Sequence, residues 1–92
     1  MEVKHEDNGV KGSFYIEIEH ARVGEMTYVW AGMDKIIIDH TEVGESLKGK
    51  GAGKIFLTEA VNFARIKGIK ILPLCPFAKS LFDKIPEFND VL

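Results

Sequence analysis

The stretch Ser46-Leu47-Lys48-Gly49-Lys50-Gly51-Ala52-Gly53-Lys54 joins an apolar run, Ile36-Ile37-Ile38, to a long pattern typical of an amphipathic helix. A strand that turns through glycines into a helix leaves backbone N–H groups without partners, where the helix dipole also favours negative charge. The glycines allow positive φ angles and a close approach of the backbone, and the lysines add positive charge. The stretch therefore predicts a cradle for a phosphate or pyrophosphate. The alternative is a tight turn with solvated lysines and no ligand.

The composition is typical of one globular domain, spanning residues 1–92. The chain is 46% hydrophobic and 28% charged with a net charge of −2, which favours a small anionic ligand over nucleic acid as the guest of the lysine cluster. The single cysteine, Cys75, is typical of a reducing compartment. Residues 1–7 lack the apolar stretch of a secretory signal, and no run approaches the ~20 apolar residues of a membrane span. We therefore expect a cytoplasmic protein, monomeric or weakly dimeric, without nucleic-acid or membrane partners.

Alternating apolar and polar residues predict an antiparallel β-meander ahead of the glycine-rich stretch. The predicted strands are residues 1–6, 13–20, 25–31 and 36–43. The predicted turns between them are residues 7–9, 22–24 and 32–35. In the second strand Phe14, Ile16 and Ile18 share one face, which predicts that all three enter the core. The continuous run Ile36-Ile37-Ile38 predicts a central strand covered on both faces.

The second half of the chain predicts a βαβ unit. Residues 54–67 place apolar side chains at spacings of three and four, and Gly68 follows where a helix C-terminus favours glycine. Residues 69–72 predict a short strand that lies parallel to residues 36–38 after a right-handed crossover.

A second helix is predicted at residues 76–84. Pro76 suits its first position, which makes Cys75 the N-cap, and Pro86 ends it, leaving residues 87–92 as a tail. The fold class is therefore α+β with a mixed sheet: an antiparallel meander, then a βαβ unit and a C-terminal helix.

Two nucleotide-binding motifs fit the glycines poorly. Residues 44–50 have the G-x-x-x-x-G-K spacing of a P-loop, but Gly51 follows where that motif needs a Ser or Thr hydroxyl for magnesium. Residues 49–53 lack the third glycine spacing of a dinucleotide fingerprint. The sequence therefore favours a different phosphate-binding loop.

The segment Lys48-Gly49-Lys50-Gly51-Ala52-Gly53 resembles the Arg/Gln-x-x-Gly-x-Gly/Ala signature of the GNAT superfamily of N-acetyltransferases, with Lys48 in place of the usual Arg or Gln. Together with residues 39–43 and 71–77, it is similar to the very short single-domain branch of that superfamily, which is little more than the acetyl-CoA-binding half. The resemblance covers about residues 10–85. It implies a minimal GNAT-like acyl-CoA N-acyltransferase fold.

The resemblance implies acetyl-CoA as the cofactor, no metal, and an unknown primary amine of a protein or small molecule as the acceptor. The residues implied in coenzyme binding are Thr41, Glu42, Val43, Lys48, Gly49, Lys50, Gly51, Ala52, Gly53, Lys54, Cys75, Pro76 and Phe77. The pyrophosphate would lie on the glycine loop, and the pantetheine arm in a gap between diverging strands. The chain lacks the parts that usually form the acceptor pocket in larger relatives. A CoA-binding or acyl-CoA-binding module without catalysis is therefore the alternative.

Acetyl transfer to an amine requires a base, because a lysine-like amine has a pKa of about 10.4 and is protonated at pH 7. Glu42 is the first candidate, since partial burial at the strand end would favour uptake of a proton. The alternative is a solvated carboxylate. His40 lies two residues earlier on the same face and is a second candidate, or else a structural histidine.

Cys75 is a candidate nucleophile. At a helix N-cap, the dipole and the free N–H groups stabilise a thiolate, whose sulfur can accept the acetyl group before passing it on. In the short branch that the sequence resembles, a cysteine at this position is considered catalytic. The alternative is a cysteine buried as a small apolar residue.

Overall fold

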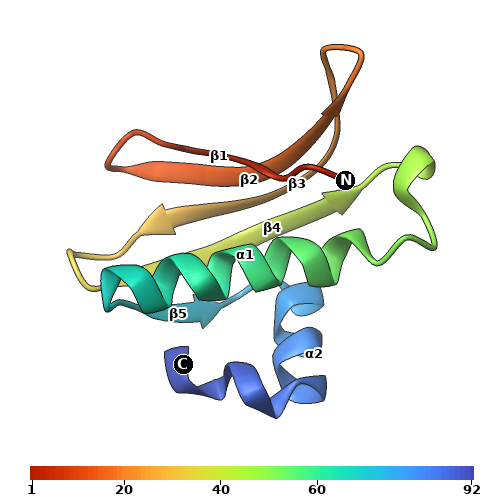
Figure 1. Cartoon of the computed structure of the whole chain (residues 1–92). Helices are drawn as coiled ribbons and strands as arrows, with labels where there is room; N and C mark the ends of the chain where they lie inside the picture. The colour runs from red at the N-terminus through yellow and green to blue at the C-terminus, as the bar shows by residue number, and fades with distance from the viewer.

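The computed structural model describes all residues from 1 to 92, and a five-stranded sheet organises it (Figure 1). The elements are β1 (Lys4–Asp7), β2 (Lys11–Ile18), β3 (Ala21–Trp30), β4 (Lys35–Val43), the 3-10 helix η1 (Glu45–Leu47), α1 (Ala52–Lys67), β5 (Lys70–Pro73), α2 (Pro76–Lys84) and the 3-10 helix η2 (Pro86–Val91). The strands lie in the order β1-β2-β3-β4-β5, antiparallel except for the parallel pair β4 and β5. The predicted α+β class, with its meander, βαβ unit and C-terminal helix, is confirmed.

Helix α1 covers one face of the sheet, and the core lies between them (Figure 1). The buried side chains from α1 are Phe56, Leu57, Ala60, Val61 and Ala64, and those from the strands include Phe14, Ile16, Met26, Ile36 and Ile38. Their spacing of three and four along the helix is the pattern that the sequence predicts. Gly68 ends the helix with φ 70, a left-handed conformation that glycine adopts at little cost. No helix is both long and apolar enough to cross a membrane.

The hairpin between β2 and β3 differs from the prediction. Residues 22–24 belong to β3, and the turn lies at Glu19 and His20, with φ values of 52 and 67. Two left-handed residues make a tight connection whose twist matches that of the strands, although neither residue is a glycine. The predicted turn at residues 22–24 is therefore wrong, because these positions pair with β2.

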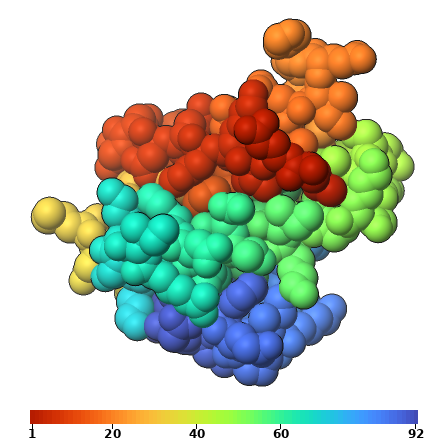
Figure 2. Space-filling model, viewed as in Figure 1, coloured from red at the N-terminus to blue at the C-terminus, as the bar shows by residue number.

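Two predicted core residues lie nearer the surface than expected. Ile18 is 45% exposed because it lies at the end of β2, where the hairpin tip projects beyond the body of the molecule (Figure 2). Ile37 is only half-buried because no helix covers the sheet face opposite α1. The prediction that strand β4 is covered on both faces is therefore wrong.

Strand β1 is tied to the sheet by polar contacts beside an aromatic cluster. The Asp7 carboxylate accepts hydrogen bonds from the Tyr28 hydroxyl and from Trp30 Nε1, the latter at 2.9 Å. His5 Nε2 lies 2.7 Å from the Tyr28 hydroxyl oxygen, and its ring stacks on Phe14 with 4.1 Å between the centroids. Because the Tyr28 proton goes to Asp7, the His5 nitrogen is the donor in this arrangement. The edge strand is thereby fixed to β3.

The C-terminal residues are not a free tail. They form η2, which buries Val91 against the core, and the Arg65 guanidinium donates to both carboxylate oxygens of Asp90 at 3.0 and 2.7 Å. Figure 2 shows this segment packed against α1. The contacts order residues that the sequence predicts to be irregular.

Candidate functional site

Strands β4 and β5 part after a short parallel pairing. The pairing covers Lys35–Ile38 of β4, and the N–H groups of Leu74 and Cys75 then both donate to the Ile38 carbonyl oxygen at 3.0 Å. Beyond this point residues 39–43 have no partner in β5. The register between β4 and β3 also shifts here, which leaves Asp39 as the extra residue of a β-bulge. An opening therefore forms between the end of β4 and the start of α2.

The backbone groups that face this opening follow from the pairing with β3. The Gly44 N–H donates to the Val23 carbonyl oxygen at 2.7 Å. Because backbone groups alternate between the two edges of an antiparallel strand, those of Glu42 also face β3, and those of Thr41 and Val43 face the opening. Of the three β4 residues predicted to bind a coenzyme arm, two therefore present unpaired backbone groups to the gap.

Cys75 is the N-cap of α2, as predicted, and lies at this opening with only 5% of its surface exposed. Its Sγ is 3.4 Å from Thr41 Oγ1. Burial raises the pKa of the thiol, but the Thr41 hydroxyl and the N–H groups of Ala78, Phe77 and Thr41 outweigh that effect, so the net pKa is lowered. While Cys75 is protonated, its sulfur accepts no capping hydrogen bond from these N–H groups. They lower the pKa because they stabilise the thiolate form.

The glycine-rich stretch has the predicted geometry of an anion cradle. Gly49 and Gly51 have φ values of 75 and 70, and the first hydrogen bond of α1 runs from the Ile55 N–H to the Gly51 carbonyl oxygen at 3.1 Å. The N–H groups with no acceptor in the protein are those of Gly49, Gly51, Ala52, Gly53 and Lys54. They gather at the positive end of the helix dipole.

Two lysines that the sequence predicts to bind the anion already have partners within the chain. The Lys50 N–H donates to the Leu47 carbonyl oxygen at 3.2 Å, so Lys50 has only its exposed side chain to offer. The Lys48 ammonium pairs with the Glu45 carboxylate at 2.7 Å. Lys54 forms no ion pair within the chain. The unengaged lysine side chains are therefore those at positions 50 and 54.

Gly53 is needed for a contact that the sequence does not indicate. A Cβ atom at this position would lie 2.1 Å from Cζ of Phe77, because the ring rests directly on the helix start. This contact joins the first turn of α1 to the first turn of α2. Phe77 remains 44% exposed, so its ring forms part of the surface at the opening, next to the exposed Pro76.

Glu42 and His40 lie together, but away from Cys75. Glu42 Oε2 is 3.5 Å from His40 Nε2, and the side chains are 74% and 57% exposed. Thr41 between them faces Cys75, so alternation along the strand sends both side chains to the opposite face of the sheet. The expected partial burial of Glu42 is wrong, because no element covers that face. No three His, Cys, Asp or Glu side chains of residues 1–92 gather as a metal site requires.

Comparisons with known proteins show the family and the fold of this chain. The sequence matches the family described as GCN5-related N-acetyl-transferase over residues 13–91. A GCN5-like N-acetyltransferase candidate from Staphylococcus aureus has a similar solution structure, with 34% sequence identity and a TM-score of 0.73 over 98% of this chain and 85% of its own. No curated protein sequence gives a significant match.

Two more distant structures share the fold. One is the ribosomal-protein-alanine N-acetyltransferase from Brucella melitensis biovar Abortus 2308, with 16% identity and a TM-score of 0.67 over 85% of this chain and 62% of its own. The other is AAC(6')-Iy in complex with the bisubstrate analog CoA-S-monomethyl-acetylneamine, with 11% identity and a TM-score of 0.57 over 88% of this chain and 62% of its own. Each of these two proteins has a substantial part that this chain does not match.

Proposed function

Because the chain belongs to the GCN5-related N-acetyltransferase family, we propose that it binds acetyl-CoA and transfers the acetyl group to a primary amine. The observation that carries this proposal is the set of unpartnered N–H groups at the start of α1, preceded by two left-handed glycines. Backbone N–H groups at a helix N-terminus suit a pyrophosphate. Lys50 and Lys54 add unpaired positive charge beside them.

The gap between β4 and β5 suits the pantetheine arm. An extended chain of amides can form hydrogen bonds with the free backbone edge at Thr41 and Val43, as an added strand would. Phe77 and Pro76 supply apolar surface on the other side of the opening. The thioester end would then lie near Cys75, where the gap is narrowest.

A covalent route uses Cys75 as nucleophile. Its thiolate attacks the thioester carbonyl, an S–C bond forms, and the CoA thiolate leaves and is protonated by water. The acceptor amine then attacks the acetyl-cysteine, a C–N bond forms, the Cys75 thiolate leaves, and the amine proton passes to water or to a carboxylate. The Thr41 hydroxyl stabilises the thiolate at both stages, because it can reorient to donate to the sulfur.

A direct route omits the acetyl-cysteine. The amine attacks the thioester from the sheet face that carries Glu42 and His40, and one of these side chains or water removes its proton. Exposure of both side chains leaves them accessible to an acceptor in solution.

Incubation with acetyl-CoA labelled in the acetyl group distinguishes the routes. Label that stays on the wild-type protein and is absent from Cys75→Ala supports the covalent route. Transfer to an added amine that persists in Cys75→Ala and falls in Glu42→Gln supports the direct route. Glu2→Gln serves as the matched control, because this exposed carboxylate lies ahead of β1 and forms no ion pair.

The alternative is a module that binds CoA or acyl-CoA without turnover. Its supporting observation is that Glu42 and His40, the two candidate bases, are exposed on the sheet face away from Cys75. Tight CoA binding with neither protein labelling nor transfer to any amine would support this alternative. Lack of CoA binding would contradict both functions. Because Cys75 is a free cysteine and the covalent route requires its thiol, we place the protein in the reducing cytoplasm.

A further inference from the structure

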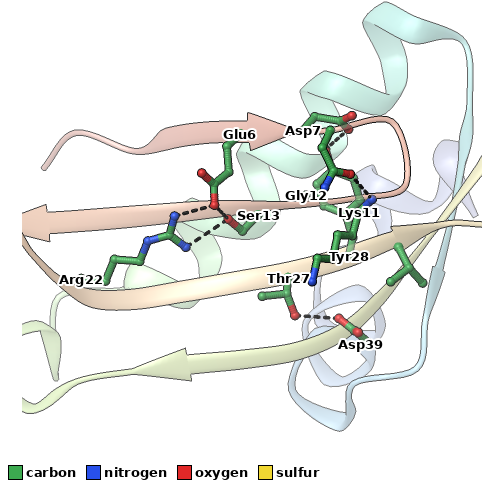
Figure 3. A pocket seen from close by; sticks show the side chains of 11 residues that line it. Glu6, Asp7, Lys11, Gly12, Ser13, Arg22, Thr27, Tyr28 and Asp39 are labelled. Atoms are coloured by element: carbon green, nitrogen blue, oxygen red, sulfur yellow. Dashed lines mark hydrogen bonds and ion pairs between the residues drawn. The ribbon is translucent and has the colours of Figure 1, made fainter.

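The sheet face opposite α1 contains a hollow of about 560 Å³ (Figure 3). Ser13 and Thr27 lie on its floor, and Glu6, Arg22 and Asp39 lie around them. Ser13 is only 4% exposed, and its hydroxyl lies within hydrogen-bond distance of the Glu6 carboxylate and the Arg22 guanidinium, at 3.1 and 3.3 Å. The hollow lies across β1, β2 and β3 and ends at Asp39 of β4.

The charged side chains around the hollow differ in the number of ion pairs and hydrogen bonds that they form. Arg22 is shared by two carboxylates: its Nη2 contacts Glu6, and its Nη1 lies 3.3 Å from Glu25. The Ser13 hydroxyl also donates to Glu6 at 3.1 Å. Asp39 accepts one hydrogen bond, from Thr27 Oγ1 at 2.6 Å, and forms no ion pair with any residue of the chain. Asp7 also lines the hollow without an ion pair, but its carboxylate accepts three hydrogen bonds, from Gly9, Tyr28 and Trp30. Asp39 is therefore the carboxylate of the hollow that lacks a counter-ion and has the fewest hydrogen bonds.

Asp39 also stands where the hollow meets the coenzyme gap. It is the bulge residue next to Ile38, whose carbonyl oxygen holds the N–H groups of Leu74 and Cys75 at the point where β4 and β5 part. The carboxylate faces the hollow, as its bond to Thr27 on the same sheet face shows (Figure 3). A group bound to Asp39 therefore lies on the opposite side of β4 from the gap, beside the residue at which β4 and β5 part.

We propose that this hollow is the acceptor site and that Asp39 binds the ammonium group of a cationic primary amine such as a lysine side chain. The proposal rests on the acetyl transfer proposed above. A carboxylate fixed by one hydrogen bond, with its other lone pairs free, suits an ammonium donor. The remaining basic residue of the hollow, Lys11, lies at its other end, opposite Val29 in the register of β2 and β3. The Lys11 ammonium group suits a carboxylate or a peptide carbonyl oxygen of the same acceptor.

The test follows backbone amide signals of the ¹⁵N-labelled full chain by NMR, in the presence of saturating CoA. The probe is Nα-acetyl-lysine amide, and its uncharged counterpart is Nα-acetyl-norleucine amide. We expect the lysine probe to shift the signals of Ser13, Thr27 and Asp39, and the norleucine probe to leave them in place. Asp39→Asn keeps an oxygen for Thr27 but lacks the charge, so it should weaken binding of the lysine probe about tenfold. Asp83→Asn is the matched control: it removes the charge of an exposed carboxylate on α2, outside the hollow, and should retain binding.

Three results would overturn the acceptor assignment: no response to the lysine probe, an equal response to both probes, or unchanged affinity in Asp39→Asn. A titration with CoA measures coenzyme binding separately, through the amide signals of residues 49–54 at the start of α1. If CoA leaves these signals unmoved, the proposed coenzyme binding fails whatever the lysine probe does. If CoA moves them and the lysine probe does not act at the hollow, only the acceptor site is wrong.

Discussion

The two ends of the sheet satisfy their hydrogen-bonding groups in different ways. At the end formed by β1, β2 and β3, side chains from neighbouring strands bind one another, as in the cluster of His5, Asp7, Tyr28 and Trp30. At the end formed by β4 and β5, backbone groups face an open gap, and the start of α1 leaves N–H groups without acceptors. Because unsatisfied groups favour binding partners, the side-chain cluster at the first end stabilises the fold, and the free backbone groups at the second end are available for a ligand.

Of the variants that test this contrast, Gly53→Ala is expected to have the largest effect, on the binding of CoA. In Gly53→Ala the new methyl group must displace the Phe77 ring, which then obstructs the N–H groups at the start of α1. CoA at 100 times its dissociation constant should stabilise the wild-type protein by about 2.7 kcal/mol, and we expect most of this stabilisation to be lost. Thermal unfolding with and without CoA measures it.

The double variant Gly53→Ala/Phe77→Ala provides the control. Removal of the ring relieves the clash, so part of the CoA stabilisation should return. If Gly53→Ala alone keeps the full wild-type response, the Phe77 contact has no role in coenzyme binding.

A smaller effect, on stability alone, is expected at Tyr28. The Tyr28→Phe variant leaves Asp7 and His5 without their shared hydroxyl, so the free energy of unfolding should fall by about 1–3 kcal/mol. Urea unfolding measures this change, and the affinity for CoA should not change. Tyr15→Phe is the matched control: Tyr15 lies under the Arg22 guanidinium on the other sheet face, and its loss of a hydroxyl should cost less than about 0.5 kcal/mol. Equal losses in the two variants would contradict the role of the cluster.

The smallest effect concerns pH. Burial lowers the pKa of His5, although the charges of Asp7 and Glu59 oppose this. The unfolded chain then binds a proton more readily than the folded protein, so stability should fall as the pH drops below about 6.5 towards the folded-state pKa. Because His5 is partly solvated, the loss should be a few tenths of a kcal/mol.

Urea unfolding at pH 7 and pH 5 tests this dependence. His5→Gln can still donate to Tyr28 but does not titrate, so it should show a flatter pH profile than the wild-type protein. His40→Gln, at an exposed position, should keep the wild-type slope. A slope lost in His40→Gln and kept in His5→Gln would contradict the assignment.

Local sequence patterns predict the elements of this fold well. The spacing of apolar residues marks α1, and Pro76 marks the start of α2, because helix periodicity and the fixed φ of proline act within a few residues. The glycines at 49 and 51 have the left-handed conformation that their residue type favours. The free N–H groups at the start of α1 are therefore predictable from the sequence, whereas the binding of an anion there stays a prediction.

Contacts between distant residues could not be predicted in this way. The contact between Gly53 and Phe77 joins two helix starts that no local pattern relates, and the same holds for Thr41 and Cys75. The bulge at Asp39 reverses which face the following residues occupy, so a simple alternation from Ile38 misplaces them. The position of Glu42 at the end of a strand predicts partial burial, but its exposure depends on whether another layer covers that face.

The fork between β4 and β5 also bears on how such a protein tolerates change. The carbonyl oxygen of Ile38 receives two N–H groups there, and every amino acid has a carbonyl oxygen. Substitutions of the side chains around the gap between β4 and β5 can therefore accumulate without closing it, provided that the backbone conformation is unchanged. A mutational library over the exposed sheet face should consequently retain the gap between β4 and β5 while the side chains around it diversify.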